Sequence, residues 1–253
     1  MINDSFDTSK PLFSPKEAFE SHGLKPIEKK TNTCIVAYSS HVKEEILNKY
    51  DNEVVAFTGT ANDIINVYYL KELNVLFYMS PVTSPAASCI LSEISYITGA
   101  KNFIFFGSCG VLVESAKDKV IIPTKAYRDE GTSYHYLEAS DFIDIKNYSL
   151  IEEVCLKNNL HYVKGYTWTT DAIYRETANN VKKRRESGCI CVEMEVSALE
   201  AVSRYLGINF YTFLLSGDIL TDSWDNADLG TIKEKAKQLT SFDVALLIAK
   251  ELK

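Results

Sequence analysis

The sequence of 253 residues predicts an α/β protein, a three-layer sandwich in which helices flank a mixed, twisted central sheet. One observation is that residues 102–106 and 208–215 are mostly apolar, aromatic or branched, as expected of strands that are buried on both faces. A second is that apolar side chains recur at helical spacing between Met194 and Leu206, before Gly207, a residue that commonly ends helices. Strands and helices therefore alternate along the chain, which favours a sheet covered on both sides.

Composition indicates one globular domain. Hydrophobic residues make up 46% of the chain and charged residues 24%, so a sizeable core can form. We expect a single domain over residues 1–253, because α/β folds of this size commonly have one. Residues 1–30 are polar and contain three prolines, and they are expected to form an arm that packs on the body or on a neighbouring subunit.

Charge and hydropathy restrict the partners and the compartment. The formal net charge of −7 argues against binding to nucleic acid, and the basic run at residues 182–185 is interpreted as the solvated face of a helix. No apolar stretch is long enough to span a membrane, so no membrane partner is expected. The first ten residues lack the pattern of an export signal. We therefore expect a cytoplasmic protein.

The first half of the chain is expected to contain five strands and two helices. Alternating or continuous apolar runs predict the strands, and apolar residues at helical spacing predict the helices. The strands are expected at 33–38, 54–58, 66–70, 75–79 and 102–106, and the helices at 41–50 and 84–97.

The second half continues the alternation. Pro123 is expected to interrupt a pair of short strands, and residues 129–135 are expected to form a loop beside the site. The final helix is amphipathic and should cover one face of the sheet. The strands are expected at 120–122, 125–128, 161–170, 189–192 and 208–215, and the helices at 149–158, 176–187, 194–206 and 231–252.

The six cysteines are interpreted as free thiols that are mostly buried. Cys189 and Cys191 point to opposite faces of a strand, so they cannot hold one metal ion together. The four histidines show no spacing typical of metal ligands. We expect no metal site.

Three acids follow buried strands in the stretch from Cys189 to Asp218. Glu193 and Glu195 are expected in the first turn of a helix, where the helix dipole favours anions, so capping charges are one interpretation of both. Asp218 follows Ser216 and Gly217 at the predicted end of a strand and has the alternative interpretation of a turn residue. The carboxyl ends of parallel strands deliver side chains to a common crevice, which favours a site.

Residues 192–208, VEMEVSALEAVSRYLGI, resemble the signature of the nucleoside phosphorylase and nucleosidase family, which includes uridine phosphorylase, hexameric purine nucleoside phosphorylase and methylthioadenosine nucleosidase. Asp218 follows Glu195 by 23 positions, the spacing found in the purine enzymes of the family. Three further segments resemble it, covering with the first most of the chain from about residue 80. They are FFGSCGVL at 105–112, DEGTSYH at 129–135 and TTDAIYRET at 169–177.

The resemblance implies roles for particular residues. Glu195 would bind the ribose hydroxyls, and Asp218 would be the general acid that protonates the departing base. Gly107 and Ser108 would meet phosphate and sugar through a hydroxyl and backbone N–H groups. The remaining implied site residues are Glu193 and Met194 at the ribose, Ile173, Tyr174, Arg175 and Glu176 at the base, and Glu130 and His135 as neighbours of the site.

The activity implied by the resemblance is that of a nucleoside phosphorylase, which converts a purine or pyrimidine nucleoside and phosphate into free base and ribose 1-phosphate. Phosphate would be a co-substrate, no cofactor is implied, and the small-molecule partners would be a nucleoside and phosphate. Family members assemble as dimers or as trimers of dimers, so a homo-oligomer is expected.

The chain departs from the family where phosphorylases hold phosphate. Their glycine-and-arginine loop after the first strand is AYSSHVK here (37–43), the arginine before the glycine turn is Phe105, and residues 56–65 contain no basic residue to lend to a neighbouring subunit. The early catalytic glutamate of the nucleosidases is also replaced, by Tyr38, Ser39 and Ser40. A hydrolytic nucleosidase and a nucleoside-binding protein without turnover therefore stay open as alternatives, and so does the choice between purine and pyrimidine.

Overall fold

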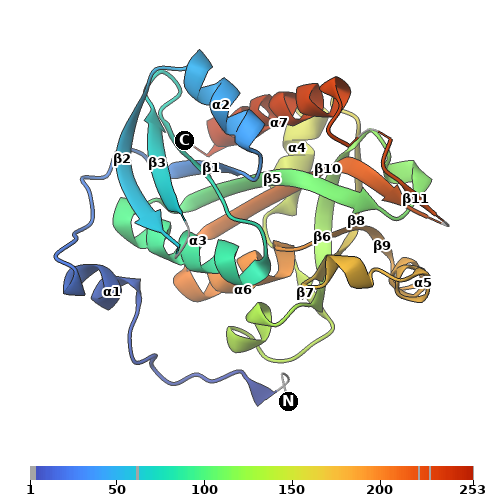
Figure 1. Cartoon of the computed structure of the whole chain (residues 1–253), viewed down its shortest axis with the longest axis horizontal. Coiled ribbons are helices and arrows are strands. Elements are labelled where there is room, and N and C mark those ends of the chain that lie inside the picture. Colours follow the sequence, from blue (N-terminus) through green and yellow to red (C-terminus); the bar gives the residue numbers. More distant parts are fainter. Residues whose placement is uncertain (1–3, 61–62, 222, 228, 253) are drawn as a thin grey trace.

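The computed structural model describes residues 4–60, 63–221, 223–227 and 229–252. One mixed sheet runs through it, with the strand order β11-β10-β6-β8-β9-β5-β1-β4-β3-β2 and with β7 beside β6. Helices lie on both sides of this sheet (Figure 1). The predicted fold class, a mixed sheet flanked by helices, is confirmed.

The first four strands agree closely with the prediction, β5 and β10 extend well beyond their predicted ends, and β7 and β11 were not predicted. Their bounds are β1 Thr33–Ala37, β2 Asn52–Gly59, β3 Ile64–Leu70, β4 Val75–Met79, β5 Asn102–Val111, β6 Val120–Asp129, β7 Phe142–Asp144, β8 Tyr162–Thr170, β9 Cys189–Glu193, β10 Asn209–Leu220 and β11 Trp224–Asp225.

Short 3-10 helices lie between some of these strands and the α-helices. The α-helices are α1 Pro15–Ser21, α2 Ser40–Lys49, α3 Ser84–Thr98, α4 Tyr148–Lys157, α5 Ala178–Glu186, α6 Val196–Leu206 and α7 Ile232–Glu251, and the 3-10 helices are η2 Glu114–Ala116, η3 Thr132–His135 and η4 Ile173–Arg175.

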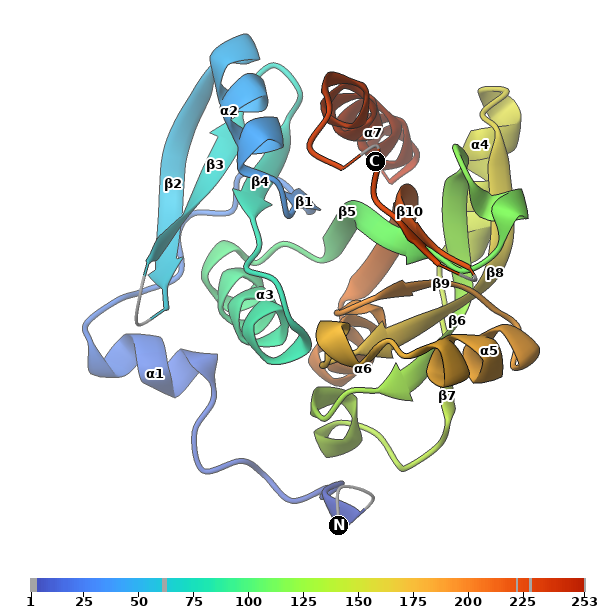
Figure 2. The same ribbon diagram turned by 45° about the vertical axis from the view of Figure 1, so that its right-hand side comes forward.

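The two faces of the sheet bury separate cores. In β1, Cys34 and Val36 belong to one hydrophobic cluster, whereas Ile35 and Ala37 belong to the other. Successive side chains of a strand point to opposite faces, so a strand buried on both sides is apolar at every position. Helices α3 and α6 cover one face, and α2, α4 and α7 cover the other (Figures 1 and 2).

Strands β5 and β10 form the centre of the sheet and pass through the segments that carry the predicted site. They are parallel, with Leu214 opposite Gly107 and Leu215 opposite Ser108. The predicted end of this strand at residue 106, before the glycine turn that the resemblance implied, is wrong, because residues 107–111 continue β5 through this pairing. Strand β10 likewise continues past Asp218, which lies where the register shifts between Ser216 and Ile219.

Strands β5, β10, β6, β8 and β9 pair successively, and β9 pairs with β5 again, so this part of the sheet closes on itself. The interruption expected at Pro123 is absent, because β6 is one strand whose register shifts between Pro123 and Lys125. Closure brings β8, β9 and β10 to one place although they are far apart in the sequence.

Two boundaries near the predicted site also differ from the expectation. Glu193 is the last residue of β9 and Glu195 is the N-cap of α6, so neither lies in the first helical turn. Helix α5 begins at Ala178, and Glu176 is the residue that ends the 3-10 helix η4. Glu176 therefore belongs to a connection rather than to a solvated helix.

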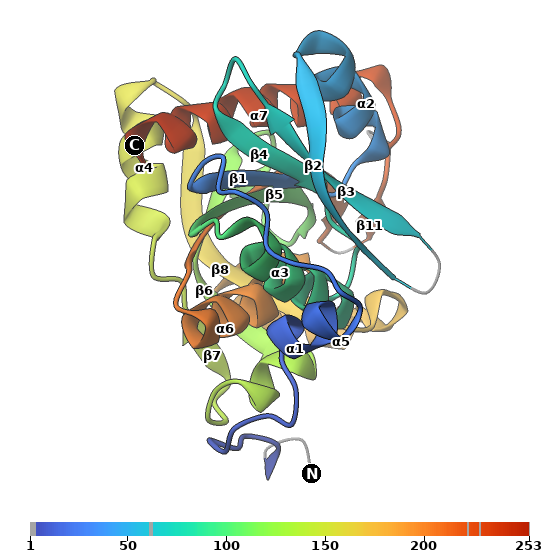
Figure 3. The same cartoon turned by 90° about the vertical axis from the view of Figure 1, so that its left-hand side faces the viewer.

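The N-terminal arm contacts the body through α1 and through the residues that follow it. Phe19 in α1 is buried against Tyr96 of α3, with their ring centroids 5.9 Å apart, and Ile27 donates a backbone hydrogen bond to Ile97. The part of the arm before α1 extends away from the sheet (Figure 3). Residues 1–3 of the predicted arm lie outside the described residues.

The cysteines agree with the expectation of free thiols, since all six are unpaired and only Cys89 is exposed. Within the described ranges no three His, Cys, Asp or Glu side chains are arranged to hold a metal ion. In the same ranges, no helix combines the length and the apolar character that crossing a bilayer requires.

Candidate active site

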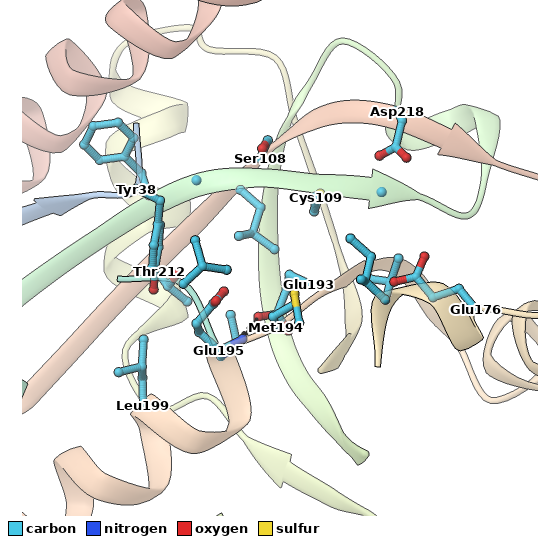
Figure 4. A pocket seen from close by; sticks show the side chains of 18 of the residues that line it. Tyr38, Ser108, Cys109, Glu176, Glu193, Met194, Glu195, Leu199, Thr212 and Asp218 are labelled. Atoms are coloured by element: carbon cyan, nitrogen blue, oxygen red, sulfur yellow. Dashed lines mark hydrogen bonds between the residues drawn. The ribbon is translucent and has the colours of Figure 1, made fainter. Parts of the chain in front are cut away.

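A cavity of about 230 Å³ lies at the carboxyl ends of β5 and β9 and beside β10. Glu195 and Asp218 both line it, so the two acids that the sequence placed at one site share one cavity. Figure 4 shows Glu195 and Tyr38 at one end of the cavity and Asp218 and Glu176 at the other. Apolar side chains form much of the wall between them, including Met194, Val196, Leu199, Leu214 and Leu220.

Glu195 is held at its end of the cavity by the start of α3. The backbone N–H of Thr83 donates to Glu195 Oε1 at 2.6 Å, and Ser84 Oγ donates to the carbonyl of Met194 at 2.6 Å. Burial and the nearby charge of Glu193 raise the pKa of Glu195 to about 8. Oε1 is held by Thr83, and Oε2 is left available to a ligand in the cavity.

The carboxylate of Glu193 accepts four hydrogen bonds from within the protein. Its Oε1 accepts from the hydroxyls of Thr167 and Thr169, at 3.1 and 2.6 Å, and its Oε2 accepts from the N–H groups of Glu195 and Val196, both at 2.7 Å. Burial raises the pKa of Glu193, and these four donors, which favour the ionised form, oppose that rise. Its contacts are those of a capping charge at the start of α6, and its predicted part in ribose binding stays a prediction.

Thr83 holds Glu195 from a strained backbone conformation. Its φ of 85° and ψ of 143° lie in a region that residues with a Cβ rarely adopt, and a β-branched side chain makes the conformation less favourable still. The conformation directs the Thr83 N–H at the Glu195 carboxyl. Strain of about 1–3 kcal/mol that persists in a fold is typical of functional sites.

At the other end, Asp218 and Glu176 have different environments. The indole N–H of Trp224 donates to Asp218 Oδ2 at 2.6 Å, whereas the carboxyl group of Glu176 makes no hydrogen bond or ion pair within the described part of the chain. Asp218 Oδ1 lies above Gly110, since a Cβ on that glycine would be 3.3 Å from it and 2.3 Å from Leu220 Cδ1. A larger residue than glycine would therefore displace both side chains.

Strand β5 forms the floor of the cavity, and Tyr38 forms the wall at one end of it. Gly107 and Ser108 line the cavity, and the ring of Tyr38 packs directly on Gly107, where a Cβ would be 2.9 Å from Tyr38 Cδ2. Burial and the neighbouring Glu195 charge raise the pKa of Tyr38 well above its ordinary value, so it remains a neutral hydroxyl. On its far side lies a second cavity of about 320 Å³, which Gly107 and Ser108 also line.

Residues 33–248 match the model of the phosphorylase superfamily. The chain belongs to this superfamily. The match covers most of the chain and confirms the resemblance seen in the sequence. It includes both ends of the cavity, from Tyr38 to Asp218.

Individual relatives carry out more than one reaction. A DeoD-type purine nucleoside phosphorylase of Bacillus cereus is 30% identical over 138 residues, which are 53% of this chain and 59% of that protein. The chain thus matches about three fifths of the length of that curated relative. The purine nucleoside phosphorylase of Toxoplasma gondii superposes with a TM-score of 0.76 at 16% identity, covering 91% of this chain and 97% of that one.

An AMP nucleosidase of Bacteroides thetaiotaomicron superposes with a TM-score of 0.68 at 20% identity, covering 87% of this chain and 89% of that one. Likeness at this level of identity shows the fold alone. Phosphorylases and nucleosidases share the fold, so the fold does not distinguish phosphate from water as the attacking group.

Some predicted site residues lie outside the cavity. Ile173 and Glu176 line it, but Tyr174 is 96% exposed and Arg175, beside it on η4, is exposed too. The roles of Tyr174 and Arg175 at the base stay predictions.

The two predicted neighbours of the site have separate surroundings. Glu130 is buried, and its carboxylate accepts hydrogen bonds of 2.9 Å from the Ser133 N–H and from Ser197 Oγ. It thereby joins η3 to the first turn of α6. His135 is exposed and borders a different cavity, between the arm and the body.

Three residues of the site had no role in the sequence analysis. Tyr38 appeared there only as a replacement for a family residue, and its position after the first strand is the one signal that pointed to the site. Nothing in the sequence indicated Thr83 or Trp224. The positive φ of Thr83 and the hydrogen bond from the Trp224 indole N–H to Asp218 arise only in the tertiary structure.

Proposed function

We propose that this protein cleaves the N-glycosidic bond of a nucleoside. The observation that carries the proposal is that Glu195 and Asp218 line opposite ends of one cavity. Breaking this bond makes the ribose cation-like and places negative charge on the base. A carboxylate at the sugar end stabilises the first change, and an acid at the base end neutralises the second.

Glu195 is suited to the sugar end. With Oε1 held by the Thr83 N–H, Oε2 is available to accept hydrogen bonds from ribose hydroxyls. Those bonds strengthen as the ring becomes positive, which lowers the barrier rather than only improving binding. Met194, Leu199 and Val196 supply apolar contact for the sugar and for one face of the base.

We propose water as the attacking group. Four acids line the cavity, Glu176, Glu193, Glu195 and Asp218, and none of the described lining residues is lysine or arginine. A phosphate dianion would meet repulsion there without a compensating cation, whereas water carries no charge. The water oxygen would bond to the anomeric carbon as the C–N bond breaks, one water proton would be released, and the base would gain one proton.

A second candidate is phosphorolysis, which the likeness to the Bacillus cereus phosphorylase favours. The cavity behind Tyr38 offers space for phosphate at the start of α2, where Ser39, Ser40 and Gln238 line it together with Ser108. Phosphate could reach the ribose from there only if the Tyr38 ring moved off Gly107. Hydrolysis needs no such movement, and for this reason we place it first.

The remaining expectations accompany this proposal. Neither form of the reaction needs a cofactor, and a cytoplasmic location suits nucleoside metabolism. We also propose a homo-oligomer, because Leu12 and Phe13 of the arm are large apolar side chains that are 102% and 73% exposed. Light scattering that found only monomer would reject this last expectation.

The test is a panel of purine and pyrimidine nucleosides, incubated with and without phosphate, with base and sugar products identified by chromatography. We expect free base and free ribose in equal amounts, independent of phosphate. Ribose 1-phosphate formed only with phosphate would reject water and support the second candidate. Tight nucleoside binding in calorimetry with no released base would reject cleavage and support a binding protein.

Two variants link the outcome to the cavity. Glu195→Gln should lower kcat/KM by roughly 100-fold, about 2.7 kcal/mol, because an amide, unlike the Glu195 carboxyl group, cannot lose a proton to offset the positive charge that develops on the ribose. Glu186→Gln makes the same change at an exposed position of α5 outside the cavity. It should leave kcat/KM unchanged.

A further inference from the structure

Two cavities lie on either side of the Tyr38 ring. The candidate active site has a volume of about 230 Å³, and the cavity at the start of α2 has a volume of about 320 Å³. Both are lined by Tyr38, Phe106, Gly107 and Ser108. The Phe106 ring is stacked on Phe213 in the core on one face of the sheet. The Tyr38 ring is therefore the large side chain that keeps the two spaces apart.

The register of the sheet and the packing around Tyr38 fix the position of its ring. Strands β1 and β5 pair in parallel as far as Phe106, so Tyr38 and Gly107 are the next residues of the two strands and lie side by side. A Cβ at Gly107 would be 2.9 Å from Tyr38 Cδ2, which shows that the ring lies directly on the strand. The ring also packs on Phe105, with centroids 6.2 Å apart, and Ser80 lies beside its hydroxyl. The ring is thus a fixed wall between the cavities.

The attacking group of the proposed reaction enters from the Tyr38 end. The departing base lies at the end formed by Asp218 and Glu176, and direct displacement at the anomeric carbon places the attacking group on the opposite face of the sugar. Figure 4 shows Tyr38 and Glu195 at that opposite end. The space that the Tyr38 ring leaves there determines which molecule can attack.

The cavity behind Tyr38 has the room and the polar groups that a nucleophile larger than water needs. One water requires only about 10–15 Å³ of cavity, far less than the 320 Å³ found here. Hydroxyl and amide groups line it, from Ser39, Ser40, Ser108 and Gln238. None of the described lining residues is charged, so this cavity lacks the four acids that repel an anion in the first one.

We infer that the Tyr38 ring selects water as the attacking group, by closing the second cavity to larger oxygen nucleophiles. The inference rests on the proposed function, because it names the residue that determines the nucleophile of that reaction. Selection of this kind needs no tighter binding of water, since a clash with the competitors is sufficient. Gly107 is part of the arrangement, because a side chain there would push the ring off the strand.

Removal of the ring would join the cavities and admit other nucleophiles. With methanol, the alcohol oxygen would bond to the anomeric carbon as the C–N bond breaks and its electron pair moves to the base. The hydroxyl proton of the alcohol would be released to solvent and the base would gain one proton, so the products would be free base and methyl riboside. With phosphate the same step would give free base and ribose 1-phosphate.

The test compares wild type, Tyr38→Ala and Tyr38→Phe on one nucleoside, in water containing either methanol or inorganic phosphate, with the sugar products identified by chromatography. Wild type and Tyr38→Phe, which both have a ring, should give free ribose. Tyr38→Ala should form methyl riboside or ribose 1-phosphate in a fraction about tenfold or more above that of wild type. Tyr38→Val also lacks the ring but keeps a larger apolar side chain, so it should give the same products and serves if Tyr38→Ala does not fold.

Leu199→Ala is the matched control. Leu199 lines the first cavity but not the second, so its truncation enlarges the site without joining the two spaces. Its sugar product should be free ribose. The inference is overturned if wild type, Tyr38→Phe or Leu199→Ala forms as much of the new products as the ringless variants do. It is also overturned if the ringless variants form free ribose alone.

A binding measurement separates this inference from the proposed function. Ribose 1-phosphate would place its sugar in the first cavity and its phosphate in the second, so calorimetry should find it bound about tenfold or more tightly by Tyr38→Ala than by wild type. This comparison requires no turnover. If wild type cleaves no nucleoside, the proposed function fails, and the binding ratio still decides whether the ring closes the second cavity. If wild type cleaves nucleosides with water and both proteins bind ribose 1-phosphate equally, only the inference about Tyr38 fails.

Discussion

The two ends of the cavity are built differently. At the sugar end, Glu193 and Glu195 are 7% and 8% exposed, and backbone N–H groups of α6 and of residue Thr83 fix their carboxyls. At the base end, Trp224 is 62% exposed and Ile173 is 50% exposed. The sugar end is therefore held by the interior of the protein, whereas the base end is held by segments at its surface. A ribose is common to all nucleosides and bases vary, so a rigid sugar end and a changeable base end suit a nucleoside site.

The largest effect is expected from Glu193, the carboxylate on which the sugar end is built. Glu193→Ala would leave two threonine hydroxyls and two N–H groups of α6 without their acceptor. We expect the free energy of unfolding to fall by about 3–5 kcal/mol, measured by urea denaturation. Glu186→Ala, at an exposed position of α5, should change it by less than about 0.5 kcal/mol. A loss below about 1 kcal/mol for Glu193→Ala would show that the network contributes little.

The second-largest effect is expected from Glu195 and concerns how the free energy of unfolding depends on pH. The pKa of Glu195 rises from its ordinary value of 4.5 to about 8 on folding. Its stabilising contribution is therefore complete below about 4.5 and is lost as the pH rises through about 8, because the unfolded chain gives up the proton first. Glu195→Gln keeps a neutral side chain at every pH. It should match wild type near pH 4.5 and be more stable by roughly 2 kcal/mol at pH 8.5.

Urea denaturation of both proteins at the two pH values measures this difference. Because other groups titrate equally in both proteins, the comparison isolates Glu195. An equal difference at both pH values would contradict the raised pKa.

The Trp224→Phe variant measures how much the hydrogen bond to Asp218 contributes at the base end of the cavity. Trp224→Phe removes the hydrogen bond to Asp218 and should lower kcat/KM by about 3- to 10-fold, or ~1 kcal/mol, with little change in unfolding. Trp168→Phe is the matched control, since its indole donates to Asp129 from a buried position outside the cavity. It should lower stability and leave kcat/KM close to wild type. Equal losses in the free energy of unfolding for both variants would show that the exposed Trp224 contact stabilises the fold as much as the buried Trp168 contact does.

The smallest effect is expected from Thr83. Thr83→Gly relieves a backbone with φ of 85°, and the gain should exceed the entropic cost of glycine, leaving a net stabilisation of about 0.5–1 kcal/mol. The N–H that holds Glu195 remains, so kcat/KM should stay within about twofold. Thr240→Gly, at an exposed position inside α7, should instead destabilise by roughly 0.5 kcal/mol. Destabilisation by both would show that Thr83 is not strained.

The sequence by itself determined the α/β class, the order of most elements and the acids that follow the strands. These depend on local periodicity, such as the alternation of Cys34, Ile35, Val36 and Ala37 between the two cores, which a short window of sequence contains. It also placed Glu195 and Asp218 near each other, because the carboxyl ends of neighbouring strands meet.

Only the tertiary structure decided which acid has which environment. Glu193 and Glu195 are two residues apart, yet Thr167 and Thr169 of β8 hold the first and Thr83, 112 positions away, holds the second. Likewise β5 and β10 extend past their predicted ends because each pairs with the other, a contact that no local window contains. Burial, hydrogen bonding and pKa depend on neighbours that are distant in the chain, so they arise only when the sheet closes and brings those neighbours together.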